Sequence, residues 1–133
     1  VLLTCQFRHV AHVRGDDPWL WEIVAGTQAP TDDGACTARR ESVEEAGYRP
    51  QALDHVASVY LSPGGCTERI HLFVAAVSPA DRVAPGGGLA EEHEDIPTAW
   101  LSRDEALAMV RRGEIMDAKT VICLQHLRSM RDG

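Results

Sequence analysis

The segment from Gly26 to Tyr48 constrains this chain more than any other stretch of its sequence. At its centre, residues 40–47 read RESVEEAG, and on an α-helix three of these carboxylates would share one face. These glutamates are three and four positions apart: Glu41, Glu44 and Glu45. Arg40 has the spacing to pair with Glu44, but one arginine offsets only part of the repulsion. We therefore expect a further cation at this face.

The chemistry of these ligands indicates which cation to expect. Clustered carboxylate oxygens without cysteine or histidine suit Mg²⁺, with Mn²⁺ as the alternative. Magnesium usually works through a few carboxylates together with the phosphates of a substrate. The segment thus predicts a metal-binding helix for phosphate chemistry. The competing interpretation is a surface helix with a solvated charged stripe.

Local signals set the bounds of this helix. Asp32 or Asp33 can accept a hydrogen bond from the first free amides, and Gly47 can end the helix in the left-handed conformation. Pro50 prevents the helix from continuing. We expect a helix over residues 34–46.

Composition limits the class of protein. A chain of 133 residues, 44% hydrophobic and 25% charged, fits one domain over residues 1–133. No stretch approaches the roughly 18 apolar residues of a membrane span. The net charge of −7 argues against nucleic acid and anionic membranes as partners, because both attract clustered lysine and arginine.

The four cysteines are scattered and form no metal-binding pair: Cys5, Cys36, Cys66 and Cys123. This usage predicts reduced thiols and a cytoplasmic location. Residues 1–3 carry no basic region or cleavage signal, so a signal peptide is not expected. We expect these residues to begin partway along a strand, which suggests a trimmed chain.

The pattern along the whole chain predicts strands and helices in the order strand, strand, helix, strands, helix, helix. Apolar runs predict strands, and capped periodic segments predict two further helices. The expected strands cover residues 1–8, 19–25, 53–61, 70–77 and 96–101, and the helices cover residues 103–112 and 117–130. Ser102 and Glu105 would form a capping box at the first of these helices. The order predicts an α/β fold, a sandwich with a mixed β-sheet covered on both faces.

Several polar features do not follow from this pattern. Glu22 is a charge in an apolar strand and requires a partner. His9 and His12 could ligate a metal or be ordinary surface residues, and residues 15–18 read as a turn. Residues 86–88 are consecutive glycines, which allow a mobile lid or a close backbone approach to a ligand. Residues 91–95 hold four acids, either a solvated run or the source of a catalytic carboxylate.

The spacing of the central segment also resembles a known motif. Gly26, Asp32, Arg40-Glu41, Glu44-Glu45 and Gly47 are spaced as in the Nudix box of the Nudix hydrolases, with departures at Asp32, usually glutamate, and Ser42, usually apolar. Further segments resemble the ADP-ribose pyrophosphatase branch: residues 6–8 (QFR), 19–26 (WLWEIVAG), 62–65 (SPGG) with Glu68, and 88–96 (GLAEEHEDI). The resemblance implies the Nudix fold, an α/β/α sandwich.

The resemblance also implies roles for individual residues. The metal ligands would be the Ala25 carbonyl, Glu41, Glu45 and Glu94. Glu92 would be the general base, with Glu45 and the assisting Glu44 as the other catalytic residues. The nucleotide sugar would contact Arg8, Glu22, Pro63, Gly64 and Glu68. Residues 91–94 hold three glutamates so close together that the choice of base is the weakest of these assignments.

The implied reaction is Mg²⁺-dependent hydrolysis of the diphosphate of ADP-ribose to AMP and ribose 5-phosphate. Members of this branch carry an additional N-terminal β segment that forms a swapped homodimer, and this chain is expected to begin after it. Three alternatives stay open. The substrate could be another nucleotide sugar, GDP-mannose or UDP-glucose. The domain could be a non-catalytic nucleotide sensor, or an interaction module with an acidic face.

Overall fold

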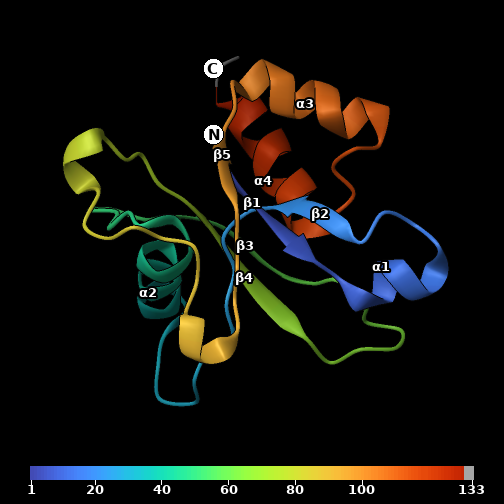
Figure 1. The fold of residues 1–133 in the computed structure, drawn as a ribbon, viewed down its shortest axis with the longest axis horizontal. Helices are drawn as coiled ribbons and strands as arrows, with labels where there is room; N and C mark the ends of the chain where they lie inside the picture. The colour runs from blue at the N-terminus through green and yellow to red at the C-terminus, as the bar shows by residue number, and fades with distance from the viewer. Residues whose placement is uncertain (131–133) are drawn as a thin grey trace.

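A computed structural model describes residues 1–130 of the chain. Strands and α-helices alternate as far as β3, after which β4 and β5 precede the consecutive helices α3 and α4, with two short 3₁₀ helices in the second half (Figure 1). The elements are β1 (Leu2–Phe7), α1 (His9–Arg14), β2 (Trp19–Glu22), α2 (Gly34–Ala46), β3 (Asp54–Tyr60), β4 (Arg69–Val74), η1 (Pro79–Asp81), η2 (Ala90–Glu92), β5 (Thr98–Trp100), α3 (Arg103–Arg112) and α4 (Ala118–Ser129).

The strands form two antiparallel sheets. In the first, β1 lies between β2 and β5, with Gln6 opposite Leu20 and Leu3 opposite Ala99. The second pairs β3 with β4 and has an irregularity between His55 and Ala57. Short connections join β1 to β2 and β3 to β4, which favours antiparallel neighbours. The predicted α/β class is confirmed, although all strand pairs among the described residues are antiparallel.

Helices flank the strands on two sides. Helix α2 packs against β1 and β4, whereas α4 packs against β4 and α3. Figure 1 shows α2 on one side of the strands and α3 with α4 on the other, consistent with an α/β/α sandwich. The buried apolar cluster lies between the first sheet and the α3–α4 pair, and comprises Leu3, Ala106, Leu107, Met109, Ile115 and Leu124. Helix α2 contributes no residue to this cluster.

The bounds of α2 and α3 agree with the prediction from local signals. The Asp33 side chain accepts a hydrogen bond from the Cys36 amide at 2.7 Å, and Gly47 ends α2 at φ 81°. At α3, Ser102 accepts from the Glu105 amide, so the predicted N-cap is confirmed. The predicted capping box is only half formed, because the Glu105 carboxylate pairs with Arg112 instead.

Two elements near the N-terminus differ from the prediction. Residues 9–14 form the short helix α1, for which the sequence predicts no element, and no side chain caps its first turn. Strand β2 ends at Glu22 rather than at residue 25. The next amides bond to side chains instead of a strand: Ile23 N–H donates to Thr120 Oγ1 at 2.8 Å, and Ala25 N–H to Glu45 Oε2 at 3.4 Å.

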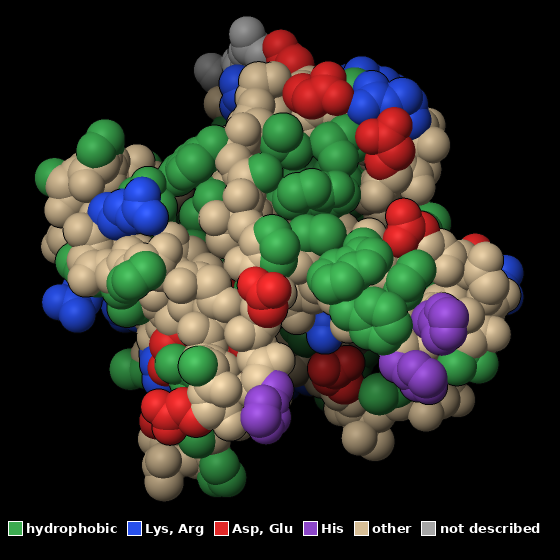
Figure 2. Space-filling model, viewed as in Figure 1, with side chains coloured by type: hydrophobic (Ala, Val, Ile, Leu, Met, Phe, Trp, Pro, Cys, Tyr) green, Lys and Arg blue, Asp and Glu red, His purple; other side chains and the backbone are tan. Residues whose placement is uncertain are grey.

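Exposed apolar side chains gather around α1 and the adjoining ends of β1 and β2. Figure 2 shows hydrophobic atoms beside histidines in this part of the surface. The exposed side chains are Phe7, Val10, Val13 and Trp19. All four cysteines are free thiols, as predicted. Within residues 1–130, no helix has the length and apolarity required to cross a membrane.

Candidate active site

Arg40 holds two of the three carboxylates that the sequence placed on one helix face. Its guanidinium contacts Glu41 Oε1 and Glu44 Oε2, each at 2.8 Å. The predicted pairing of Arg40 with Glu44 is confirmed. Burial raises the pKa of Glu41, and the charges of Glu44 and Glu94 add to this rise although Arg40 opposes it. The arginine thus offsets only part of the negative charge on α2.

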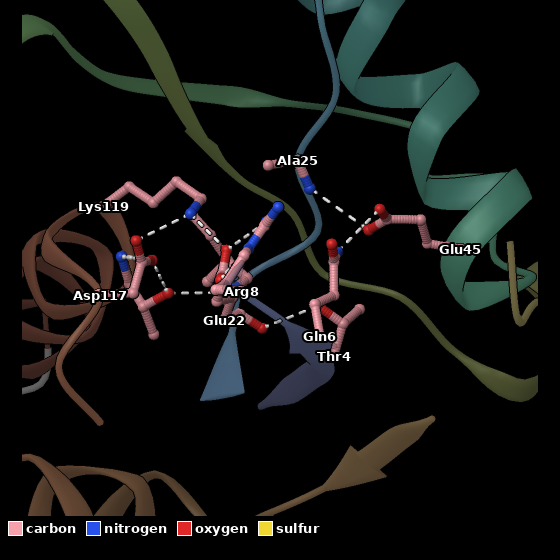
Figure 3. Close-up of polar contacts among 10 residues, drawn as sticks. Thr4, Gln6, Arg8, Glu22, Ala25, Glu45, Asp117 and Lys119 are labelled. Carbon is pink, nitrogen blue, oxygen red and sulfur yellow. Dashed lines mark hydrogen bonds and ion pairs between the residues drawn. The ribbon is translucent and has the colours of Figure 1, made fainter. Parts of the chain in front are cut away.

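Glu45 is the buried member of the set, with 3% of its surface exposed. Its Oε1 accepts a hydrogen bond from Gln6 Nε2 at 3.1 Å, and its Oε2 accepts from the Ala25 amide at 3.4 Å (Figure 3). Burial raises the pKa of Glu45 to about 7, and the nearby charges of Glu41 and Glu94 contribute. Among the described residues, no lysine or arginine forms an ion pair with this carboxylate.

The loop after β2 passes directly over α2 at Gly26. A Cβ added at this glycine would lie 1.9 Å from Glu41 Cδ, so only glycine leaves room for the carboxylate. Ala25, one residue earlier, contacts Glu45. The loop therefore brings the backbone at Ala25 and Gly26 beside two of the predicted metal ligands.

The glycine segment at residues 86–88 is attached to the C-terminal end of α2. Gly87 N–H donates to the Glu45 carbonyl at 2.7 Å, and Gly88 N–H donates to the Glu44 carbonyl at 3.0 Å. All three glycines have φ between 76° and 97°. A Cβ at Gly86 would lie 2.8 Å from the Glu45 carbonyl oxygen. These glycines let their segment approach the main chain of α2 closely. Approach to a ligand and movement as a lid stay predictions.

The acidic loop that follows presents its glutamates differently. Glu94 is half-buried, its Oε2 accepts from the Leu89 amide at 2.9 Å, and its charge raises the pKa of both Glu41 and Glu45. Glu92 lies on η2 and is exposed. The structure thus places Glu94 on the side of the α2 carboxylates and leaves Glu92 facing solvent.

A second cluster surrounds Glu22, which is 2% exposed. Arg8 donates to both carboxylate oxygens at 2.7 and 2.8 Å, and Lys119 Nζ lies 2.6 Å from Oε2 (Figure 3). Asp117 holds Lys119 in turn at 2.8 Å. Burial alone would raise the pKa of Glu22, but the hydrogen bonds from Arg8 and Lys119 outweigh it and lower the pKa. The expected partner of Glu22 is therefore a pair of cations.

Lys119 and Asp117 were not foreseen as site residues. Lys119 is 97 positions from Glu22 in the sequence, and its neighbours carry no motif. The one local signal is the position of Asp117 at the start of α4, where its side chain accepts from the Thr120 amide. That signal predicts a helix cap rather than a site residue.

Three predicted substrate-binding residues lie in the connection between β3 and β4. Pro63, Gly64 and Glu68 are exposed there, and the hydrogen bonds of this connection are local. Cys66 N–H donates to the Ser62 carbonyl at 2.8 Å, and Glu68 N–H to Cys66 Sγ at 3.4 Å. The described contacts do not join these residues to the Arg8 cluster.

The carboxylates of α2 fit a hard divalent cation by their chemistry, although they are not arranged around one. Within residues 1–130, no group of three or more aspartate, glutamate, histidine or cysteine side chains is positioned to hold a metal ion. Arg40 pairs with Glu41 and Glu44, whereas Glu45 contacts the neutral amide of Gln6 and a backbone N–H. The raised pKa values of Glu41 and Glu45 show that negative charge at this place is unfavourable until a cation offsets it.

An apolar cavity of about 380 Å³ lies elsewhere, between α2, β4 and α4. Its lining includes Leu3, Ala38, Phe73 and Leu124, and none of the carboxylates described above. Within residues 1–130, the lining holds the hydroxyl groups of Ser42 and Tyr48 but no lysine or arginine to offset the charge of a diphosphate. The polar face around Glu45 and Arg8 is therefore the better candidate for the site.

Comparison with known proteins identifies the family. Residues 1–121 match the NUDIX domain. Similar proteins include "GDP-mannose pyrophosphatase" of Cronobacter sakazakii, 45% identical over 96% of this chain and 66% of the relative, and that of Citrobacter koseri, 42% identical over 97% and 66%. The protein of the same name from Salmonella typhimurium is 40% identical over 97% and 66%. The chain spans just under two thirds of the length of these relatives. It belongs to the NUDIX domain family.

Proposed function

We propose that this chain hydrolyses the diphosphate of a nucleotide sugar, and that GDP-mannose is its substrate. The proposal rests on Glu45, which is buried on α2 of the NUDIX domain with no cationic side chain paired to it among the described residues. Such a carboxylate suits a cation that arrives with a phosphate substrate. The similarity to proteins named GDP-mannose pyrophosphatase supports this substrate over ADP-ribose. Addition of water across the diphosphate would yield GMP and mannose 1-phosphate.

Glu41, Glu45 and Glu94, with the Ala25 carbonyl, would hold the cation, for which we propose Mg²⁺. When bound, the cation neutralises the diphosphate and makes a water molecule more acidic. Glu44 would assist through Arg40, which it shares with Glu41. In the loop over residues 91–95, Glu94 faces the α2 carboxylates and Glu92 is exposed, and we assign Glu92 to take the proton of the attacking water.

The cluster around Glu22 would receive the substrate. The Arg8 side chain is 38% exposed while its guanidinium is held by Glu22, so it can still reach an anionic ligand. Glu22 itself is buried with both oxygens occupied, and we assign it the task of fixing Arg8. Contact of the substrate with Pro63, Gly64 and Glu68 stays a prediction.

Hydrolysis of GDP-mannose, ADP-ribose and UDP-glucose, measured with Mg²⁺ and with EDTA, tests the proposal. We expect Mg²⁺-dependent release of GMP from GDP-mannose, and at least a 100-fold lower kcat in Glu45→Gln. Glu114→Gln is the matched control, since this exposed glutamate pairs with Arg112 far from α2, and its kcat should stay within twofold. Hydrolysis that continues in EDTA would contradict the assignment of α2.

ADP-ribose is the second candidate substrate. The turn at residues 62–65, which is typical of the ADP-ribose branch, favours it. Release of AMP from ADP-ribose at a kcat/KM above that for GDP-mannose would decide in its favour. We also propose that the protein is a cytoplasmic homodimer, and measurement of its mass in solution tests the dimer.

A further inference from the structure

Gln6 contacts Glu45 from the sheet that faces α2. It is half-buried on β1, the central strand of its sheet, and its backbone is paired with Leu20 of β2. Figure 3 shows the Gln6 side chain directed at Glu45, between that carboxylate and the Arg8 cluster. The nitrogen Nε2 lies 3.1 Å from Glu45 Oε1. The pairing of Gln6 with β2 gives this amide a fixed origin, whereas β5 pairs with β1 only over residues 2–4.

The alternation of side chains along β1 connects the two clusters. Thr4, Gln6 and Arg8 are two positions apart and therefore project from the same face of the strand. Thr4 donates to the Glu22 carbonyl, Gln6 to the Glu45 carboxylate and Arg8 to the Glu22 carboxylate. One strand thus positions groups toward both buried glutamates.

The chemistry of the Gln6 contact differs from that of an ion pair. An ionised carboxylate only accepts hydrogen bonds, so it requires the NH₂ end of the amide. That donor fixes one oxygen but adds no positive charge, and it leaves the remaining lone pairs of Glu45 able to coordinate a cation. A lysine or arginine at position 6 would instead compete with the cation for the carboxylate.

We propose that Gln6 is a positioning residue for Glu45: its amide holds the carboxylate in the orientation in which it binds a divalent cation. The inference rests on the proposed function, because it assigns Glu45 to the cation. It goes further by assigning a task to β1, outside the box of residues 26–47. It also predicts that Gln6 acts on cation binding before any substrate is present.

Titration of the substrate-free chain with Mn²⁺, followed by electron paramagnetic resonance, tests this task directly. Gln6→Met keeps the length of the side chain and removes the donor, and we expect about tenfold weaker Mn²⁺ binding. Gln6→His keeps an N–H at a similar reach and should restore binding to within about threefold of the wild type. The KM for GDP-mannose at saturating Mg²⁺ should change less than twofold in both variants.

Gln51→Met is the matched control, because Gln51 makes a similar bond to the exposed carboxylate of Asp81 at 3.2 Å. It should bind Mn²⁺ as the wild type does. Unchanged Mn²⁺ affinity in Gln6→Met, with wild-type hydrolysis intact, would overturn the inference and leave the proposed function standing. A raised KM with unchanged Mn²⁺ affinity would also overturn it, since Gln6 would then bind substrate. A wild type that binds no Mn²⁺ would overturn both.

Discussion

Two glutamates of this chain are almost equally buried, yet their surroundings are opposite. Glu22 is 2% exposed and held by Arg8 and Lys119, whereas Glu45 is 3% exposed and receives hydrogen bonds from a neutral amide and a backbone N–H. The pKa of Glu22 is lowered, and that of Glu45 is raised to about 7.

The fold neutralises one buried carboxylate with its own cations and leaves the other without a cation. A buried carboxylate with its own cations can organise a binding surface without any ligand. One without them makes the folded state less stable until a cation binds, and the binding then supplies the missing charge. Burial alone does not distinguish these two cases, but the partners of each carboxylate do.

The largest expected effect on stability comes from removing the carboxylate that has its own cations. Glu22→Gln should lower the free energy of unfolding by about 3 kcal/mol, because Arg8 and Lys119 would then face each other without the carboxylate. Urea denaturation at pH 7 measures this loss. Restoration of part of it by adding Lys119→Met would confirm that the remaining cations are its cause.

Gly26→Ala tests the geometry beside the α2 carboxylates. The added methyl would overlap the Glu41 carboxylate, which must swing away, so Mn²⁺ binding should weaken about tenfold, or about 1.4 kcal/mol. The free energy of unfolding should change little, because the end of a side chain can move. Gly65→Ala, where the methyl meets nothing within 4 Å, controls for the general effect of replacing glycine on stability.

Removing the carboxylate that has no cation should change the free energy of unfolding in the opposite direction from Glu22→Gln. In EDTA at pH 8, Glu45→Gln should raise the free energy of unfolding by about 1 kcal/mol, because a neutral amide replaces an uncompensated buried charge. Added Mg²⁺ should stabilise the wild type but not the variant. Destabilisation equal to that of Glu22→Gln would mean that Glu45 is a structural residue.

The dependence of stability on pH gives the subtlest contrast. The raised pKa of Glu45 means that the folded state binds its proton more tightly than the unfolded state, so metal-free stability should fall as the pH rises from about 4.5 to about 7. The lowered pKa of Glu22 means that its contribution is present above about 4.5 and is lost as the pH falls further. Paired urea titrations of the wild type and each glutamine variant isolate the two contributions. A pH-independent difference would contradict either assignment.

Local signals in the sequence predicted the elements well. Helix α2 begins and ends at the predicted residues because the Asp33 cap and the Gly47 terminus act over a few positions. Helix α1 was missed because it has six residues and no side-chain cap, so its pattern does not differ from that of a loop. The shortening of β2 depends on Thr120, which lies 97 positions from Ile23.

The site residues were predictable where they lie close together in the sequence. The spacing of Glu41, Glu44 and Glu45 indicated a shared face, and the pairing of Arg40 with Glu44 follows from that spacing. The contacts that distinguish the two buried glutamates join residues distant in sequence, such as Gln6 with Glu45 and Lys119 with Glu22. A periodic pattern within one helix contains no information about such partners.

The attachment of the glycine segment to α2 has a consequence for engineering. The loop that carries Glu92 and Glu94 is held by main-chain bonds at both of its ends: Gly88 N–H donates to the Glu44 carbonyl, and Ile96 N–H to the Gly87 carbonyl at 3.0 Å. These bonds do not depend on which side chains residues 89–95 carry. New acids or substrate contacts could therefore be introduced at the exposed positions of this loop without rebuilding the helix that supports it, whereas Glu94 also accepts a hydrogen bond from the Leu89 amide.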